Sequence, residues 1–226
     1  RFLQRRKAMK VWRMDELLDA RFESAGSLWG EGLIVPGGAF IIYGPPESFK
    51  SFFAHQLLFA ISTGRKYLGL DTVEAPGLYI EVEIPIAKFQ ERTQALAAGY
   101  GLVSTKLYTA HPQLFSLARE DERDLLDAII ASNAEVVILD PINRLMVGSE
   151  NNDQDIKAMF KVIDRVRAKV ERPVALGLVH HINKGIWNEA GDRVDRGFVD
   201  LSGSKDVAAW ADTIIRLTRL PQAKTV

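Results

Sequence analysis

The sequence contains no cysteine, little proline and no net charge, and each of these shortages excludes a class of protein. Among the 226 residues there are 0 Cys and 9 Pro, and the formal net charge is +0. Without cysteine the chain can form neither a disulfide framework nor a thiolate metal site. No apolar run exceeds six residues, whereas a helix that spans a bilayer needs about 20. No secretory leader pattern is present, so a packed cytoplasmic α/β protein is expected.

The neutral total conceals a basic N-terminal arm. Residues 1–13 carry six basic side chains and no acidic one, so the arm is +6 and the remainder is −6. A short amphipathic helix is expected from Met14 to Phe22, followed by a turn-rich entry to the first strand. We therefore divide the chain into a basic arm with a linker helix, residues 1–29, and one domain, residues 30–226. Because an initiator Met is absent, a longer parent protein is expected.

Apolar runs alternate with helical patterns through the rest of the chain. Strands are predicted at 39–43, 77–82, 106–109, 136–139, 174–179 and 213–217, and helices at 50–62, 85–99, 120–132 and 153–170. The helix at 153–170 is indicated most clearly, because its apolar residues recur at intervals of three and four. Alternation of this kind predicts an α/β fold, a mostly parallel twisted sheet with helices on both faces.

Eight residues directly after the first predicted strand have the pattern of a phosphate-binding loop. The pattern needs a glycine, backbone N–H groups in front of a helix N-terminus, a lysine for the β- and γ-phosphates and a hydroxyl for Mg²⁺. Gly44, Lys50 and Ser51 have the required spacing, so ATP and Mg²⁺ are the expected ligands. An ordinary strand-to-helix turn with a surface lysine is the simpler alternative. The predicted nucleotide-binding residues are Gly44, Pro45, Pro46, Glu47, Ser48, Phe49, Lys50, Ser51 and Phe52.

Phe49 stands at the position where this pattern usually has glycine. Its side chain is expected to point away from the nucleotide, and its backbone to avoid a conformation reserved for glycine. The departure keeps open a third function, a nucleotide-binding module that no longer hydrolyses ATP.

Carboxylates lie at the ends of two further predicted strands. Asp140 follows four apolar residues, and at the carboxyl end of a parallel strand it can hold Mg²⁺ opposite Ser51. Pro141 comes next, where many ATPases carry a catalytic glutamate, so the general base must come from another strand. Glu81 and Glu83 share one side of their strand by alternation. Glu83, nearer the carboxyl edge, is the predicted general base, and Glu81 is expected to be a structural partner.

Together these motifs resemble the RecA-like P-loop ATPases of the plasmid RepA type, which are relatives of the DnaB-type hexameric replicative helicases. The resemblance implies a RecA-like P-loop NTPase core, in which Phe49 is a subfamily trait. It covers roughly residues 30–219. Besides the phosphate loop, its motifs are Thr63-Gly64-Arg65, Leu68-Gly69, Leu78–Glu83, Asp140, His180–Lys184, Ser202-Gly203-Ser204 and Ala211-Asp212.

The resemblance also implies a role for a histidine after the fifth predicted strand. In that family a polar residue there contacts the γ-phosphate and relays its loss to a mobile loop. A histidine is suited to this contact because it can donate a hydrogen bond near pH 7. By position this residue is His181, with His180 as the second choice and a core histidine as the simpler alternative.

Two loops, 143–152 and 182–200, would face the central channel of a ring in this family. The second loop sums to −1, which weakens an inference of nucleic-acid binding, because such binding is mainly phosphate neutralisation. A solvated loop is therefore an equal alternative for each basic residue. The candidate DNA contacts are Arg144, Lys184, Arg193 and Arg196.

The sequence leaves three functions open. The resemblance implies a DNA helicase motor of a plasmid or phage-like replication protein, a hexameric homo-oligomer on single-stranded DNA, fused to a primase or another replication domain. The alternative is a RecA-like regulatory ATPase that switches protein partners without DNA, and the third is the module without hydrolysis. No membrane partner is expected. Because Lys50 is the only cation of the phosphate loop and the motifs offer no obvious second one to the transferred phosphate, a neighbouring subunit is expected to supply it.

Overall fold

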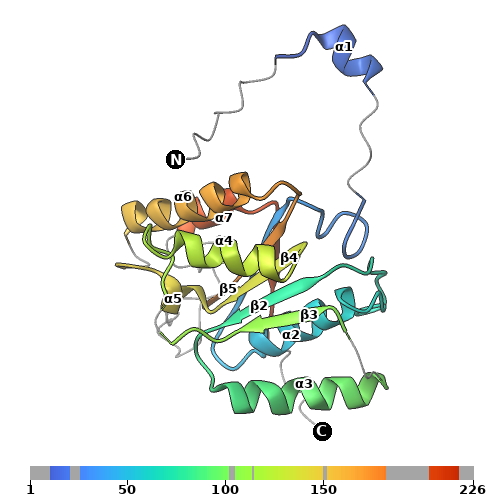
Figure 1. Cartoon of the computed structure of the whole chain (residues 1–226), viewed down its shortest axis with the longest axis vertical. Helices are drawn as coiled ribbons and strands as arrows, with labels where there is room; N and C mark the ends of the chain where they lie inside the picture. The colour runs from blue at the N-terminus through green and yellow to red at the C-terminus, as the bar shows by residue number, and fades with distance from the viewer. Residues whose placement is uncertain are drawn as a thin grey trace, which may run out of the picture.

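A computed structural model describes residues 11–20, 26–101, 105–113, 115–149, 152–181 and 204–218. A central sheet with helices on its two faces fills most of this part of the chain (Figure 1). The strands are β1 (Ala39–Gly44), β2 (Gly77–Glu81), β3 (Leu107–Ala110), β4 (Val136–Asp140), β5 (Ala175–His181) and β6 (Thr213–Arg216). The helices are α1 (Met14–Asp19), α2 (Lys50–Ile61), α3 (Ile86–Tyr100), α4 (Glu122–Ala131), α5 (Ile142–Leu145), α6 (Asp153–Lys169) and α7 (Ser204–Trp210).

The sheet has six strands in the order β3-β2-β4-β5-β1-β6, and every pairing is parallel. This confirms the predicted α/β architecture, and the six predicted strands end within two residues of the observed ones. One expectation is wrong in part. The predicted loop at 143–152 begins as a helix, because α5 continues to Leu145, whose buried side chain packs into the core.

The sheet separates two hydrophobic cores because neighbouring residues of a strand face opposite sides. In β1, Ile41 and Tyr43 pack with α4, α5 and α6, whereas Phe40 and Ile42 pack with α2 and α3 (Figure 1). The close packing restricts side-chain size. A Cβ atom on Gly177 would lie 2.2 Å from the ring of Phe40, so glycine is required there.

Helix α6 has the predicted amphipathic pattern and is connected to α4 by salt bridges. The side chain of Asn152 caps the helix by accepting a hydrogen bond from the N–H of Gln154. Arg165 and Lys169 both contact the buried carboxylate of Glu122, with an Arg165 Nε to Glu122 Oε2 distance of 2.7 Å. Burial alone would raise the pKa of Glu122, but hydrogen bonds from Lys169 and Arg165 lower it. The carboxylate therefore remains charged at neutral pH.

The core on the α2 side includes two residues that directly precede Gly30. Leu28 and Trp29 are buried in the core on the α2 side, and Trp29 forms antiparallel bridges with Ile34 and Thr72. Helix α1, by contrast, has no buried residue. Residues 1–10, which contain most of the basic arm, lie outside the described residues.

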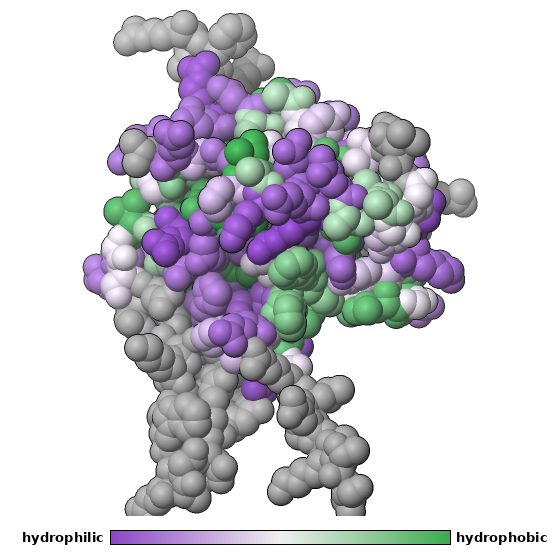
Figure 2. Space-filling model, turned by 90° about the horizontal axis from the view of Figure 1, so that it is seen from below, coloured by the Kyte–Doolittle hydropathy of each residue, from purple (hydrophilic) through white to green (hydrophobic). Residues whose placement is uncertain are grey.

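Helix α3 covers the lower end of the sheet in the view of Figure 1. Only Phe89 of this helix is buried. From below, hydrophilic residues cover much of the described surface, with apolar side chains between them (Figure 2). No helix in the described ranges is long and apolar enough to cross a membrane.

His55 of α2 makes stability dependent on pH. It is buried, its ring stacks on Phe89 at 4.4 Å between centroids, and its Nε2 lies 3.2 Å from Thr93 Oγ1. Burial and, to a smaller extent, Arg92 lower the pKa of His55 to about 4. The pKa of a histidine in an unfolded chain is near 6.5. Between about pH 4 and pH 6.5 the unfolded chain therefore binds a proton at this residue that the folded chain does not.

We therefore expect the free energy of unfolding to fall as the pH is lowered from about 6.5 to about 4, by up to roughly 3 kcal/mol from this residue. Urea unfolding at several pH values measures the slope, and His55→Gln is expected to make it shallower. An unchanged slope in this variant would contradict the assignment.

Candidate functional site

The predicted site residues gather where four parallel strands end. Strand pairing places Gly44, at the end of β1, beside His181, at the end of β5. It also places Glu81, at the end of β2, beside Asp140, at the end of β4. In open parallel sheets ligands bind at this carboxyl edge, so the topology brings together groups that are far apart in the sequence.

The loop between β1 and α2 is tightly packed. A Cβ atom on Gly44 would lie 2.4 Å from the carbonyl oxygen of Leu217 and 2.8 Å from Ser48 Oγ, so only glycine fits. The loop leads directly into α2, whose first-turn N–H groups have no partner within the helix. These N–H groups and the helix dipole favour an anion at this position.

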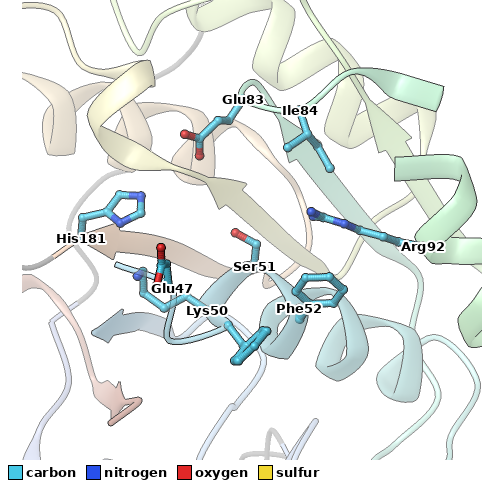
Figure 3. A pocket seen from close by; sticks show the side chains of 9 residues that line it. Glu47, Lys50, Ser51, Phe52, Glu83, Ile84, Arg92 and His181 are labelled. Atoms are coloured by element: carbon cyan, nitrogen blue, oxygen red, sulfur yellow. The ribbon is translucent and has the colours of Figure 1, made fainter. Parts of the chain in front are cut away.

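A cavity of about 480 Å³ opens in front of this loop (Figure 3). Of the predicted residues, Glu47, Phe49, Lys50, Ser51, Phe52, Glu83 and His181 line it, together with Ile84 and Arg92. Asp140 is buried and is not part of the cavity lining. Of the predicted DNA contacts, Arg144 is exposed on α5 and is not part of the cavity lining. Lys184, Arg193 and Arg196 lie outside the described residues.

Lys50 is a buried cation with carboxylates nearby. Its side chain is almost fully buried, and its Nζ donates a hydrogen bond of 2.7 Å to the carbonyl oxygen of Pro45. Burial lowers the pKa of Lys50, and this effect is opposed by Asp140 and Glu83. Lys50 thus places its Nζ at the base of the cavity, where an ammonium charge out of water attracts an anion strongly.

Asp140 is held by Tyr79, a residue of the Leu78–Glu83 motif to which the sequence analysis assigned no role. The hydroxyl of Tyr79 donates to Asp140 Oδ2 at 2.5 Å and lies 3.3 Å from the backbone oxygen of Ser51. Burial raises the pKa of Asp140, whereas hydrogen bonding to Tyr79 and Ser51 lowers it. Tyr79 therefore connects the strand that carries Asp140 to the helix that carries Ser51.

Two buried oxygens at the site fit the requirements of bound Mg²⁺ and phosphate. Within the described part of the chain, Asp140 Oδ1 and Ser48 Oγ are buried and have no hydrogen-bond partner. Buried polar atoms of this kind usually have a partner. The described residues contain no cluster of three or more acidic or histidine side chains that could hold a metal alone. Mg²⁺ keeps several waters and uses few protein ligands, and Ser51 and Asp140 stay the predicted ones.

The two candidate carboxylates at the carboxyl end of β2 and just after it have different environments. Glu83 is exposed and lines the cavity, whereas Glu81 is 3% exposed and does not. The Oε1 atom of Glu81 accepts hydrogen bonds from the backbone N–H groups of Glu83 at 2.8 Å and Ile84 at 3.1 Å. Burial, and to a smaller extent the charge of Asp140, raise the pKa of Glu81 to about 7. Of the two, only Glu83 faces a space that a reactant can enter.

The two adjacent histidines, His180 and His181, also differ in burial. His181 is partly exposed and lines the cavity, whereas His180 is 2% exposed. Successive residues of a strand face opposite sides, so only one of the two can face the cavity. His181 is also the last residue of the described range 152–181.

Arg92 is a cavity residue that lies outside every motif in the sequence. Its guanidinium is 4.3 Å from the centre of the Phe52 ring, and the two side chains lie side by side in Figure 3. The one signal in the sequence is helical spacing, because Arg92 follows the buried Phe89 by three residues on α3 and such residues share a helix face. The cavity therefore holds a second cation besides Lys50.

Phe49 adopts the backbone conformation that the sequence analysis expected it to avoid. Its φ is 64° and its ψ is 26°, in the left-handed region. Its side chain is 69% exposed and contacts the Phe52 ring edge-on at 6.0 Å between centroids. The left-handed region favours glycine but is open to other residues at a cost of roughly 1–2 kcal/mol, so the loop keeps its shape without glycine.

We expect Phe49→Gly to leave ATP binding intact and to raise the free energy of unfolding by about 0.5–1 kcal/mol. The mostly exposed ring loses little burial, and glycine removes the backbone strain. Leu68→Gly is the matched control, since Leu68 has a φ of 52° and is also 69% exposed. Urea unfolding and calorimetric titration with ATP measure both effects. A loss of stability by Phe49→Gly would show that the ring contributes packing.

Comparison with protein families assigns the chain to one of them. The AAA_25 family model, described as an AAA domain, matches residues 3–185. This chain belongs to the AAA_25 family. The matched segment contains the phosphate loop, Glu83, Asp140 and His181. Among curated proteins none matches the chain.

The AAA_25 domain also resembles solved structures. One of them is an ATPase domain with 13% sequence identity and a TM-score of 0.58, and the match covers 81% of this chain and 70% of that one. At this identity the likeness concerns the fold. Together with the all-parallel sheet and the loop in front of α2, it shows a RecA-like P-loop NTPase fold.

Proposed function

We propose that this AAA_25 domain is a Mg²⁺-dependent, ATP-hydrolysing motor that forms a ring on single-stranded DNA, a helicase motor of a plasmid or phage-like replication protein. One observation carries the hydrolysis. Lys50, Ser51 and Glu83 line one cavity at the carboxyl edge, and Asp140, buried at the end of β4, has an oxygen without a hydrogen-bond partner. This set offers a cation for the phosphates, two ligands for Mg²⁺ and a carboxylate for the attacking water.

Each residue has a role that follows from its chemistry. The Lys50 ammonium binds the β- and γ-phosphates, and the α2 N-terminus binds them through its N–H groups. Ser51 and Asp140 would hold Mg²⁺, which would neutralise phosphate charge. Glu83 accepts the proton of the attacking water. His181 donates to the γ-phosphate, and its neighbours from residue 182 onward relay the loss of that phosphate.

Ring formation and DNA binding are supported by similarity to other proteins and by basic residues. The family resemblance in the sequence, membership of AAA_25 and a fold shared with the solved ATPase domain favour them. Arg144, exposed on α5, and the basic residues Lys184, Arg193 and Arg196 are the proposed DNA contacts. A cation from the neighbouring subunit, added to Lys50 and Arg92, would balance charge during transfer. A fused primase or another replication domain would complete the parent protein.

The near-zero net charge favours a second candidate, a regulatory ATPase that switches protein partners without DNA. One experiment separates the candidates: ATP turnover per subunit at several protein concentrations, with and without single-stranded DNA or RNA, with mass followed by light scattering. For the motor, ATP turnover per subunit must rise with protein concentration in parallel with the mass of the assembly, and must rise again when DNA is added. A rise with concentration alone favours the regulatory ATPase, and ATP binding without turnover favours the module without hydrolysis. A fully active monomer at nanomolar concentration overturns the ring.

We expect His181→Ala to lower the DNA-stimulated rate by roughly 10- to 100-fold, the worth of one hydrogen bond to a charged group, and the basal rate by less. The reason is that His181 lies between the cavity and the segment that begins at residue 182. Steady-state assays with and without single-stranded DNA measure the two rates. Equal losses in both would make His181 a residue of the basal reaction only.

A further inference from the structure

The turn after β2 is fixed by a buried carboxylate. Glu81 is the last residue of β2, and its Oε1 accepts hydrogen bonds from the N–H groups of Glu83 and Ile84. Both of these residues line the cavity, and Glu81 does not. One buried oxygen thus holds two successive N–H groups of the segment that presents Glu83 to the cavity.

The sheet itself leaves this segment unsupported. The last backbone hydrogen bond across this edge runs from the N–H of Val82 to the carbonyl oxygen of Asp140, at 3.1 Å. Beyond it the chain leaves β2, and helix α3 begins only at Ile86. Between the two elements the Glu81 oxygen takes the place of the strand partner. The backbone at Glu83 and Ile84 therefore depends on this side chain for its conformation.

We propose that Glu81 is a positioning residue for ATP hydrolysis, which orients Glu83 by holding the backbone N–H groups of Glu83 and Ile84. The proposal rests on the proposed function. It needs only an acceptor oxygen at residue 81 and no negative charge there. A general base must lie within hydrogen-bond reach of its proton, and a misplacement of about 1 Å at a reacting group lowers a rate by roughly 10²-fold.

Two substitutions of similar shape separate the acceptor from the charge. Glu81→Gln keeps the side-chain oxygen, and Glu81→Leu removes it. We expect Glu81→Leu to lower kcat by roughly 10²-fold, with unchanged affinity for a non-hydrolysable ATP analogue, and Glu81→Gln to retain most of the rate. Thermal unfolding monitors the fold. If Glu81→Leu does not fold, Glu81→Thr, which is too short to reach the two N–H groups, replaces it.

A double-mutant cycle provides the decisive readout. If Glu81 acts through Glu83, then Glu81→Leu added to Glu83→Gln lowers the residual rate no further, because the group being positioned is already inactive. A general structural defect would lower the rate in both backgrounds. The proposal is overturned if Glu81→Leu retains kcat, if Glu81→Gln loses as much as Glu81→Leu, or if the two losses multiply. Absence of turnover in the unmodified chain overturns the proposed function and this inference together, and is recognised before any variant is made.

Discussion

Glu83→Gln is expected to retain ATP binding while turnover falls by roughly 10²–10⁴-fold, the usual contribution of a general base. The amide has nearly the same shape as the carboxylate but cannot accept a proton from water. Glu83 is suited to the role by position, because it is an exposed carboxylate in the cavity that contains Lys50 and Ser51. Its backbone N–H is held by Glu81, so the substitution leaves the turn in place.

Steady-state turnover and calorimetric binding of a non-hydrolysable analogue measure the two expected effects of Glu83→Gln. The matched control is Glu91→Gln, which removes the same charge from an exposed position on α3 outside the cavity lining. Turnover that persists in Glu83→Gln but is abolished by Glu81→Gln would assign the base to Glu81 instead.

Lys50→Ala is expected to weaken ATP binding by roughly 10- to 100-fold, which corresponds to the 1.5–3 kcal/mol of a hydrogen bond to a charged group. Lys50 is the cation of the phosphate loop, and its burial makes its charge effective. The same burial lowers the pKa of Lys50. The free protein therefore gains little stability from the ammonium, and the free energy of unfolding is expected to change much less than the binding free energy.

Calorimetric titration with Mg²⁺-ATP tests the affinity of Lys50→Ala, and urea unfolding tests its stability. Lys88→Ala, at an exposed position of α3 outside the cavity lining, is the matched control. Unchanged affinity would mean that the 44–51 segment is not a phosphate loop. A large loss of stability would mean that the contact between Lys50 and Pro45 supports the fold.

Local sequence patterns were sufficient to predict the six strands and the four longest helices, but neither α5 nor α7. The four apolar residues before Asp140 and the apolar run before Gly44 have the pattern of buried strands. Such continuous runs are typical of a parallel sheet, because both of its faces are buried. Once the sheet is parallel, all strand ends fall on one edge. The proximity of the phosphate loop, Glu83, Asp140 and His181 therefore follows from local patterns and one topological rule.

Which side chains contact one another at that edge depends on the tertiary structure and is not predictable from the sequence patterns. The sequence does not indicate that Tyr79 holds Asp140, that Glu81 turns back to the N–H groups of the next turn, or that Arg92 reaches the cavity from α3. Phe49 occupies the left-handed region against its own preference, in a loop whose Gly44 packs tightly against Ser48 and the backbone of Leu217. These features depend on distances between segments far apart in the chain, and periodicity reports only what lies within one segment.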